Sequence, residues 1–217
     1  WLCGFTTSSK VSKKKYSFIT GNGTSAIYLA LKCSKIKKKS YIAISNISCP
    51  DLVYAIIWAG YRPYFIDIEL SDYNISVNSL EKSISENSNI KGVVAVHLFG
   101  NSCDISRIHD ISKNNNIFLI EDCAQSFGLV NSEYRLGSYG DVSIYSFGNG
   151  KILELGHGGS IQSDDKTLID KVKVEYKKLP IFDKVKIDRL SKVHRYLYYK
   201  IYYLGLRLPV LNILNLV

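Results

Sequence analysis

The sequence has 217 residues, of which 46% are hydrophobic and 22% are charged, and its formal net charge is +9. A chain of this length and composition can bury a full hydrophobic core, which excludes a disordered or collagen-like protein. No run of about 18 uncharged apolar residues is present and the first residues lack a signal-peptide pattern, so we expect a cytoplasmic protein. Because the chain starts with Trp1 and contains no methionine, we also expect it to be part of a longer protein.

The cysteines and lysines exclude two further classes of protein. The five cysteines are widely spaced and odd in number, without a Cys-x-x-Cys pair, so we expect reduced thiols and no metal site. Lysines cluster at residues 13–15 and between residues 35 and 39, but no nucleic-acid recognition motif accompanies them. We therefore expect no nucleic-acid partner.

Short β-branched runs alternate with segments of helical periodicity along the chain. This pattern predicts a three-layer α/β domain, with a mostly parallel sheet of about seven strands and helices on both faces. The last two strands are joined by a glycine-rich loop too short for a crossover helix, so one of them should run antiparallel to a neighbour or pair at a distance. In chain order we expect strand 16–20, helix 25–33, strand 41–45, helix 50–59, strand 63–68, helix 77–85, strand 92–98, helix 104–114, strands 117–121, 141–147 and 159–162, and helix 166–179.

The first candidate site follows the first strand. Ligands of open α/β sheets bind outside the carboxyl ends of the strands. Here Gly21–Ala26 leads directly into a helix, and glycines followed by the hydroxyls of Thr24 and Ser25 suit a phosphate at a helix N-terminus. The same segment also fits a tight turn whose helix is capped by Thr24 or Ser25.

Three other strand ends carry chemically active groups. Glu121 and Asp122 close a hydrophobic strand, where a carboxylate needs a cation or a strong donor as partner, and one of the two must point toward the crevice. Lys151 lies between glycine-rich stretches, where a desolvated lysine becomes a nucleophile toward carbonyls. A helix cap or surface acid, and a solvated loop lysine, are the alternatives. His97, at another strand end, is more often a structural residue than a catalyst.

An anion cradle, a carboxylate and a lysine at one edge of a sheet meet the needs of pyridoxal phosphate. This cofactor has a phosphate, a pyridine nitrogen that a carboxylate keeps protonated, and an aldehyde that a lysine captures as a Schiff base. The combination is much more specific than any of its parts, so it favours an enzyme with this cofactor.

Six segments in a fixed order carry a family resemblance: Gly23–Leu31, Ala59–Ile68, Tyr73–Ile75, Val96–Gly100, Glu121–Gln125 and Ser146–Lys151. In residue type and spacing, over about residues 16–170, they resemble the DegT/DnrJ/EryC1/StrS aminotransferases, which are pyridoxal-phosphate enzymes of sugar metabolism. The implied fold is the large domain of pyridoxal-phosphate transferases of the aspartate-aminotransferase type.

The resemblance also implies roles for individual residues. Lys151 and Asp122 would be catalytic, with Lys151 holding the cofactor covalently and Asp122 pairing with the pyridinium nitrogen. Gln125 would contact the cofactor ring or its phenolic oxygen. The phosphate would be held by four residues: Gly23, Thr24, Ser25 and Ser146.

The activity that the resemblance implies is transfer of an amino group from glutamate to a nucleotide-linked keto sugar, in a cytoplasmic homodimer that serves amino-sugar or polysaccharide biosynthesis. Two departures stand out. Cys49 occupies the segment where many members stack an aromatic ring on the cofactor. The Gly-x-Asn-x-Arg segment that usually follows the lysine has no match around residues 186–196.

The expected domain organisation is a cofactor-binding large domain at residues 1–190 and an aromatic, apolar tail at residues 191–217, with the family's smaller C-terminal domain missing. For the tail we favour packing against a domain or subunit over contact with a membrane surface. The alternative to the enzyme is a truncated or degenerate protein of this fold with a non-catalytic binding role. A dehydrogenase-like nucleotide binder is disfavoured, since no acid stands about twenty residues after the glycine-rich turn.

Overall fold

The structure is a computed structural model, and it describes residues 12–130 and 135–180. The helices and strands of these residues belong to one compact unit, which ends at Lys178. The expected domain boundary at residue 190 and the tail at residues 191–217 lie outside the described residues. Among the described residues, no helix is both long and apolar enough to span a membrane.

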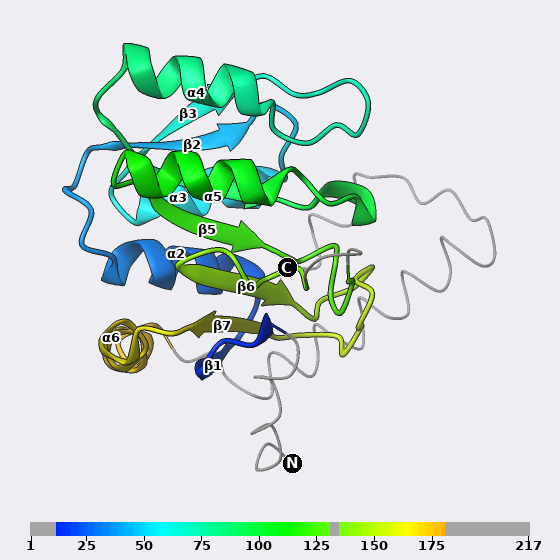
Figure 1. The fold of residues 1–217 in the computed structure, drawn as a ribbon. Coiled ribbons are helices and arrows are strands. Elements are labelled where there is room, and N and C mark those ends of the chain that lie inside the picture. The colour runs from blue at the N-terminus through cyan, green and yellow to red at the C-terminus, as the bar shows by residue number, and fades with distance from the viewer. Residues whose placement is uncertain (1–11, 131–134, 181–217) are drawn as a thin grey trace, which may run out of the picture. The chain divides into compact units, whose positions relative to one another are not determined.

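A seven-stranded sheet forms the centre of the unit, in the order β1-β7-β6-β5-β4-β2-β3 (Figure 1). The pairs β2–β3, β2–β4, β4–β5 and β5–β6 are parallel, whereas β7 is antiparallel to both β1 and β6. The mostly parallel sheet and the antiparallel strand near the end of the chain confirm the sequence predictions. The strands are β1 (Tyr16–Thr20), β2 (Tyr41–Ser45), β3 (Arg62–Ile66), β4 (Ile90–Val96), β5 (Phe118–Asp122), β6 (Val142–Ser146) and β7 (Gly159–Ser163).

Helices cover both faces of the sheet. Figure 1 shows α4 and α5 in front of the sheet and α2 and α3 behind it, with α6 beside β1 and β7. Three layers are the result, as the alternating pattern predicted. The helical elements are α2 (Gly23–Cys33), α3 (Pro50–Trp58), α4 (Val77–Glu86), a 3₁₀ turn η1 (Leu98–Gly100), α5 (Ile105–Asn114) and α6 (Lys166–Tyr176).

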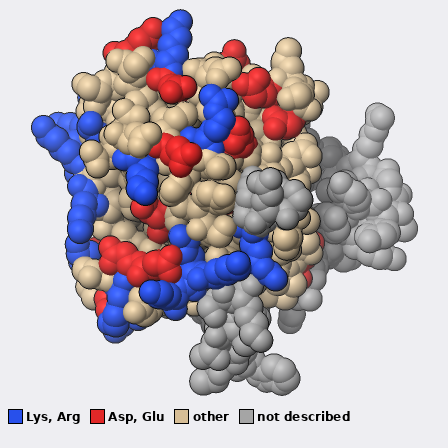
Figure 2. All heavy atoms as spheres, in the orientation of Figure 1, with Lys and Arg blue, Asp and Glu red and all other residues tan. Residues whose placement is uncertain are grey.

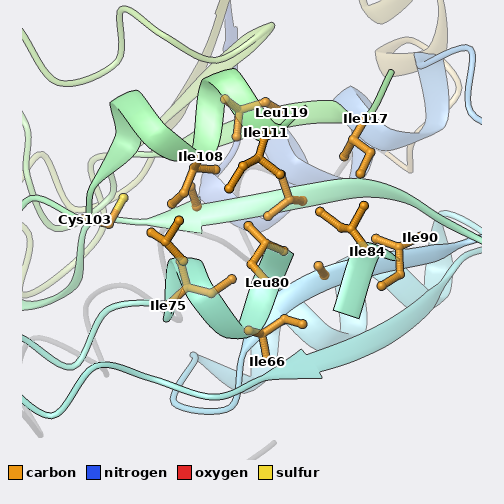
Figure 3. Close-up of a cluster of buried hydrophobic side chains, with 14 of the residues drawn as sticks. Ile66, Ile75, Leu80, Ile84, Ile90, Cys103, Ile108, Ile111, Ile117 and Leu119 are labelled. Carbon is orange, nitrogen blue, oxygen red and sulfur yellow. The ribbon is translucent and has the colours of Figure 1, made fainter. Parts of the chain in front are cut away.

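One hydrophobic core cluster lies between the sheet and the α4 and α5 layer (Figure 3). Apolar residues spaced three or four apart place one face of each helix against the strands, as amphipathic helices do. Leu80 and Ile84 of α4 pack with Ile108 and Ile111 of α5, and Leu119 of β5 closes the cluster from the sheet. This core holds β4 and β5 rigidly, and both strands carry candidate site residues at their ends.

Several element boundaries differ from the sequence predictions. Helix α2 begins two residues earlier than expected because the side chain of Asn22 caps it, accepting from the Ser25 N–H at 2.7 Å. The alternative interpretation, in which Thr24 or Ser25 caps this helix, was therefore wrong in its choice of cap residue. Strand β4 ends at Val96 rather than residue 98, since the chain turns into η1.

Charged side chains of both signs occupy the surface. On the face shown in Figure 2, Lys and Arg side chains lie among Asp and Glu side chains. Within α6, Asp170 pairs with Lys166 at 2.5 Å and with Lys173 at 2.9 Å. This helix therefore carries mixed rather than purely basic charge. The four cysteines among the described residues are free thiols.

Candidate functional site

The first part of the site is the turn between β1 and α2, which contacts the end of β6. Gly23, the first residue of α2, lies against Ser146, the last residue of β6. A Cβ added at Gly23 would stand 2.9 Å from the Cβ of Ser146, closer than real Cβ atoms approach. The structure therefore requires glycine at this position and brings together two of the residues predicted to hold a phosphate.

Polar groups at this turn are available to a ligand. The N–H groups in the first turn of a helix have no partner within the helix. Asn22 satisfies that of Ser25, whereas no described residue accepts a hydrogen bond from the Thr24 N–H or pairs with the Ser146 hydroxyl. The Thr24 hydroxyl is already engaged weakly, at 3.5 Å from a carboxylate oxygen of Asp51. The turn thus presents donors at a helix N-terminus, an arrangement that attracts anions.

Close backbone packing fixes the turn in place. The N–H of Gly158 donates to the Gly21 carbonyl at 2.9 Å, and the N–H of Phe147 donates to the Gly158 carbonyl, also at 2.9 Å. A Cβ at Gly159 would lie 2.5 Å from the carbonyl carbon and oxygen of Asn22. The start of β7 therefore locks the β1–α2 turn against the end of β6.

The second part of the site is a cavity of about 380 Å³ next to the end of β5. Lys151 is partly buried there, in the loop between β6 and β7. The loop is closed by the N–H of Gly150, which donates to a carboxylate oxygen of Glu154 at 3.0 Å. Lys151 and Gln125, two of the predicted site residues, both line this cavity, so it contains the amine of one and the amide of the other. Its lining residues are Phe99, Gly100, Gln125, Gly150, Lys151 and Ile152.

Asp122 is a buried carboxylate that interacts electrostatically with Lys151. Its side chain accepts from the N–H of Ala124 at 2.9 Å. Burial raises the pKa of the Asp122 carboxyl, while the Ala124 N–H and the positive charges of Lys151 and His97 oppose the rise. Asp122 therefore combines a desolvated carboxylate with a nearby amine, and no protein cation pairs with it directly among the described residues.

Glu121 precedes Asp122 in β5, and adjacent residues of a strand point to opposite faces of the sheet. The Glu121 side chain therefore has a different environment from that of Asp122. Its completely buried carboxylate accepts from His97 Nε2 at 3.0 Å and from the N–H groups of Gly137, Tyr139 and Gly140 at 2.5, 2.9 and 3.0 Å. Burial alone would raise the pKa of this carboxyl, but the hydrogen bonds outweigh burial and lower it. Glu121 therefore anchors residues 137–140, and of the two adjacent carboxylates Asp122 is the one not taken up by this network.

His97 completes this buried network. Its ring is fully buried, and its Nδ1 accepts from the N–H of Cys103 at 3.3 Å while Nε2 faces Glu121. Donor atoms of His97, Glu121 and Cys123 lie within 4.8 Å of one another. The cluster does not fit a metal ion, because each Glu121 oxygen already accepts two hydrogen bonds. The structure supports the structural role of His97.

Sequence reasoning missed two contributors. Phe99 has φ +56°, a left-handed conformation, and its N–H donates to Gln125 Oε1 at 2.8 Å. Asn74 bonds the N–H of Leu98 through its Oδ1 at 2.9 Å. Both lie in segments that carried the family resemblance, which was the available signal. Cys49 is exposed at the start of α3, and the expected Gly-x-Asn-x-Arg position lies outside the described residues.

Comparison with known sequences points in one direction. A sequence model of the DegT/DnrJ/EryC1/StrS aminotransferase family matches residues 7–192. The chain is similar to GDP-perosamine synthase of Escherichia coli O157:H7, with 34% identity over 157 residues that cover 72% of this chain and 43% of the relative. It is also similar to dTDP-3-amino-3,6-dideoxy-alpha-D-galactopyranose transaminase of Aneurinibacillus thermoaerophilus, with 34% identity covering 74% of this chain and 44% of the relative.

Solved structures show the same fold. An aminotransferase from Psychrobacter cryohalolentis matches with a TM-score of 0.70 and 29% identity, covering 76% of this chain and 42% of that chain. NtdA from Bacillus subtilis, solved with bound cofactor PMP, matches with a TM-score of 0.70 and 27% identity, covering 76% of this chain and 37% of that chain. The chain spans less than half the length of the curated relatives that it matches.

Proposed function

The chain belongs to the DegT/DnrJ/EryC1/StrS aminotransferase family, and from this premise we propose that it binds pyridoxal 5′-phosphate and that its whole protein transfers an amino group from glutamate to a nucleotide-linked keto sugar. The observation that carries the proposal is the cavity that Lys151 and Gln125 share, with the buried carboxylate of Asp122 near Lys151.

The β1–α2 turn fits the phosphate of this cofactor. Gly23 leaves open the space that a Cβ would fill beside Ser146, and the Ser146 hydroxyl and the Thr24 N–H are available as donors. Helix α2 adds the positive end of its dipole at the same place. In this proposal Gly23, Thr24, Ser25 and Ser146 bind the phosphate.

The cavity residues fit the cofactor ring and its carbonyl group. When bound, pyridoxal phosphate supplies an electrophilic carbonyl and an electron-withdrawing pyridine ring. Asp122 would pair with the ring nitrogen and keep it protonated, since its buried carboxylate lacks a directly paired cation among the described residues. Lys151 would hold the cofactor through its amine and could move protons there, and Gln125 would offer its amide to an oxygen of the ring.

The substrate class rests on the relatives. GDP-perosamine synthase and the dTDP-linked transaminase are both named for amino sugars attached to nucleotides. Glutamate as donor and a cytoplasmic homodimer follow from the family resemblance. The exposed side chains of Tyr54, Ile57 and Trp58 on α3 support a dimer, because they form an apolar helix face in which the Tyr54 and Trp58 rings stack at 5.7 Å.

A non-catalytic protein of this fold is the alternative, and it is not favoured. A binding or scaffolding role needs neither an amine in the cavity nor a buried carboxylate near it. The chain keeps both, in Lys151 and Asp122, together with Gln125.

Absorbance spectroscopy tests the proposal on the 217-residue chain. With added pyridoxal phosphate, the chain should develop the yellow absorbance of a lysine-bound cofactor, and Lys151→Ala should abolish it. Lys166→Ala is the matched control, since Lys166 is exposed on α6 and pairs only with Asp170 among the described residues. Equal absorbance in the Lys151→Ala variant would overturn the assignment of the lysine.

A further inference from the structure

The side chain of Asn74 bridges the two ends of the turn formed by residues 98–101. Asn74 lies between β3 and α4 and is 2% exposed. Its Oδ1 accepts from the Leu98 N–H at 2.9 Å, and its Nδ2 donates to the Asn101 carbonyl at 3.4 Å. A buried amide that uses both ends in this way fixes the conformation of the segment it spans.

Within this turn Phe99 adopts a left-handed conformation, with φ +56° and ψ +24°. Residues with a bulky side chain avoid this region unless their surroundings impose it. Here the bonds of Asn74 on both sides of Phe99 impose it, together with the Asn101 N–H, which donates to the Leu98 carbonyl at 2.8 Å. The imposed conformation directs the Phe99 N–H toward Gln125 Oε1 at 2.8 Å.

The Phe99 N–H determines which end of the Gln125 amide faces the cavity. A backbone N–H can only donate, so the Gln125 atom opposite it must be the oxygen. The Nε2 group, with its two hydrogens, remains for the ligand, and no described residue accepts from it. Without the Phe99 contact, the amide could rotate and present an acceptor instead.

We propose that Asn74 is a positioning residue that acts through the turn at residues 98–101, so that Gln125 presents a donor to an oxygen of the bound ligand. The inference rests on the proposed function, in which that ligand is pyridoxal phosphate. Asn74 does not reach the ligand itself, because its side chain is used by Leu98 and Asn101. A purely structural asparagine would support the fold without coupling to Gln125.

Substitution of Asn74 removes little besides this bridge. The Asn74 N–H donates to Asp72 Oδ1, and the Asn74 carbonyl accepts from the Glu69 N–H, both at 2.9 Å. These are main-chain contacts, which a substituted side chain retains. Asn74→Ala therefore frees the turn at residues 98–101 while it keeps the local backbone pairing.

A double-mutant cycle on pyridoxal phosphate binding tests the coupling. In the 217-residue chain, Asn74→Ala and Gln125→Ala should each weaken binding about tenfold, the effect of one lost hydrogen bond, and the double variant should bind no more weakly than either. Independent effects, which multiply to about a hundredfold loss in the double variant, would overturn the proposal. Asn115→Ala is the matched control, because the Asn115 side chain bonds only the Ile111 carbonyl at the end of α5.

Hydrogen exchange followed by NMR gives a readout that needs no cofactor. Exchange of the Phe99 N–H should be faster in Asn74→Ala than in the wild type and unchanged in Asn115→Ala. An unchanged Phe99 exchange rate in Asn74→Ala would overturn the proposal. If Asn74→Ala does not fold, Asn74→Asp replaces it, since it keeps the acceptor for Leu98 and turns the contact with the Asn101 carbonyl from a hydrogen bond into an unfavourable contact between two oxygens. If the wild-type chain fails to bind pyridoxal phosphate, the proposed function fails, while the exchange measurement still decides the role of Asn74.

Discussion

Replacing Glu121 by glutamine should destabilise the fold strongly, although the two side chains have the same shape. The Glu121 carboxylate accepts four hydrogen bonds in complete burial. An amide has one oxygen, so one of the two positions must hold an NH₂ group that faces donors. The cost depends on which position the NH₂ group takes.

If the NH₂ group replaces Oε2, the N–H groups of Tyr139 and Gly140 lose their acceptor. If it replaces Oε1, the Gly137 N–H loses its acceptor. His97 could then accept from the amide only by moving its proton to Nδ1, where the Cys103 N–H would lose its acceptor in turn. Either arrangement therefore leaves two buried donors unsatisfied.

A buried donor without an acceptor costs about 1–3 kcal/mol, so two of them cost about 2–6 kcal/mol. Typical domains have a free energy of unfolding of about 5–15 kcal/mol, so Glu121→Gln should remove a large share of the stability. Urea unfolding of the 217-residue chain, followed by circular dichroism, measures this loss.

Asp122→Asn is the matched control, one residue along the same strand. The asparagine oxygen can still accept from the Ala124 N–H, and the substitution removes a carboxyl whose pKa burial raises. Without cofactor at neutral pH, this variant should be as stable as the wild type or more stable. A loss below about 1 kcal/mol for Glu121→Gln, or an equal loss for both variants, would refute the assignment of Glu121 to structure and Asp122 to the site.

Three further predictions follow from the same contacts. Because a Cβ at Gly23 would stand 2.9 Å from the Cβ of Ser146, Gly23→Ala should weaken pyridoxal phosphate binding at least tenfold, measured by titration followed by absorbance. An unchanged affinity would contradict this prediction. The folded protein lowers the pKa of the Glu121 carboxyl from 4.5, so the stability that this carboxylate contributes is present above pH 4.5 and is lost as the pH falls through the lower folded-state pKa. The difference in unfolding free energy between wild type and Glu121→Gln should therefore shrink in acid. A difference that stays constant with pH would count against an ionised Glu121. Trp58→Ser, at a side chain that is 64% exposed, should shift the proposed dimer toward monomer in sedimentation experiments without loss of helix content, and an unchanged distribution would place the interface elsewhere.

Much of the fold follows from local patterns in the sequence. Alternation of β-branched strands and amphipathic helices predicts the layers. The glycine-rich loop before Gly159 predicts that one of the last two strands runs antiparallel to a neighbour or pairs at a distance, and in the structure β7 is antiparallel to β6. The cap of α2 was harder to predict, because Asn22, Thr24 and Ser25 all favour this position. The structure selects Asn22, whose side chain reaches the Ser25 N–H.

The candidate site depends on contacts between distant segments, which local patterns do not specify. From the sequence, either Glu121 or Asp122 could face the crevice. The family resemblance implies Asp122, and the N–H groups of Gly137 and Gly140, which bond to the Glu121 carboxylate, support that choice. The orientation of Gln125 likewise depends on a residue 26 positions earlier, Phe99.

Borohydride reduction followed by peptide mass spectrometry tests the central claim most directly. The 217-residue chain, mixed with pyridoxal phosphate and reduced, should carry the cofactor on the peptide that contains Lys151, which lines the cavity with Gln125. The Gly23→Ala variant should carry less of it at the same cofactor concentration. Cofactor fixed mainly on another lysine, or spread over the surface lysines with none on Lys151, would contradict the proposed site.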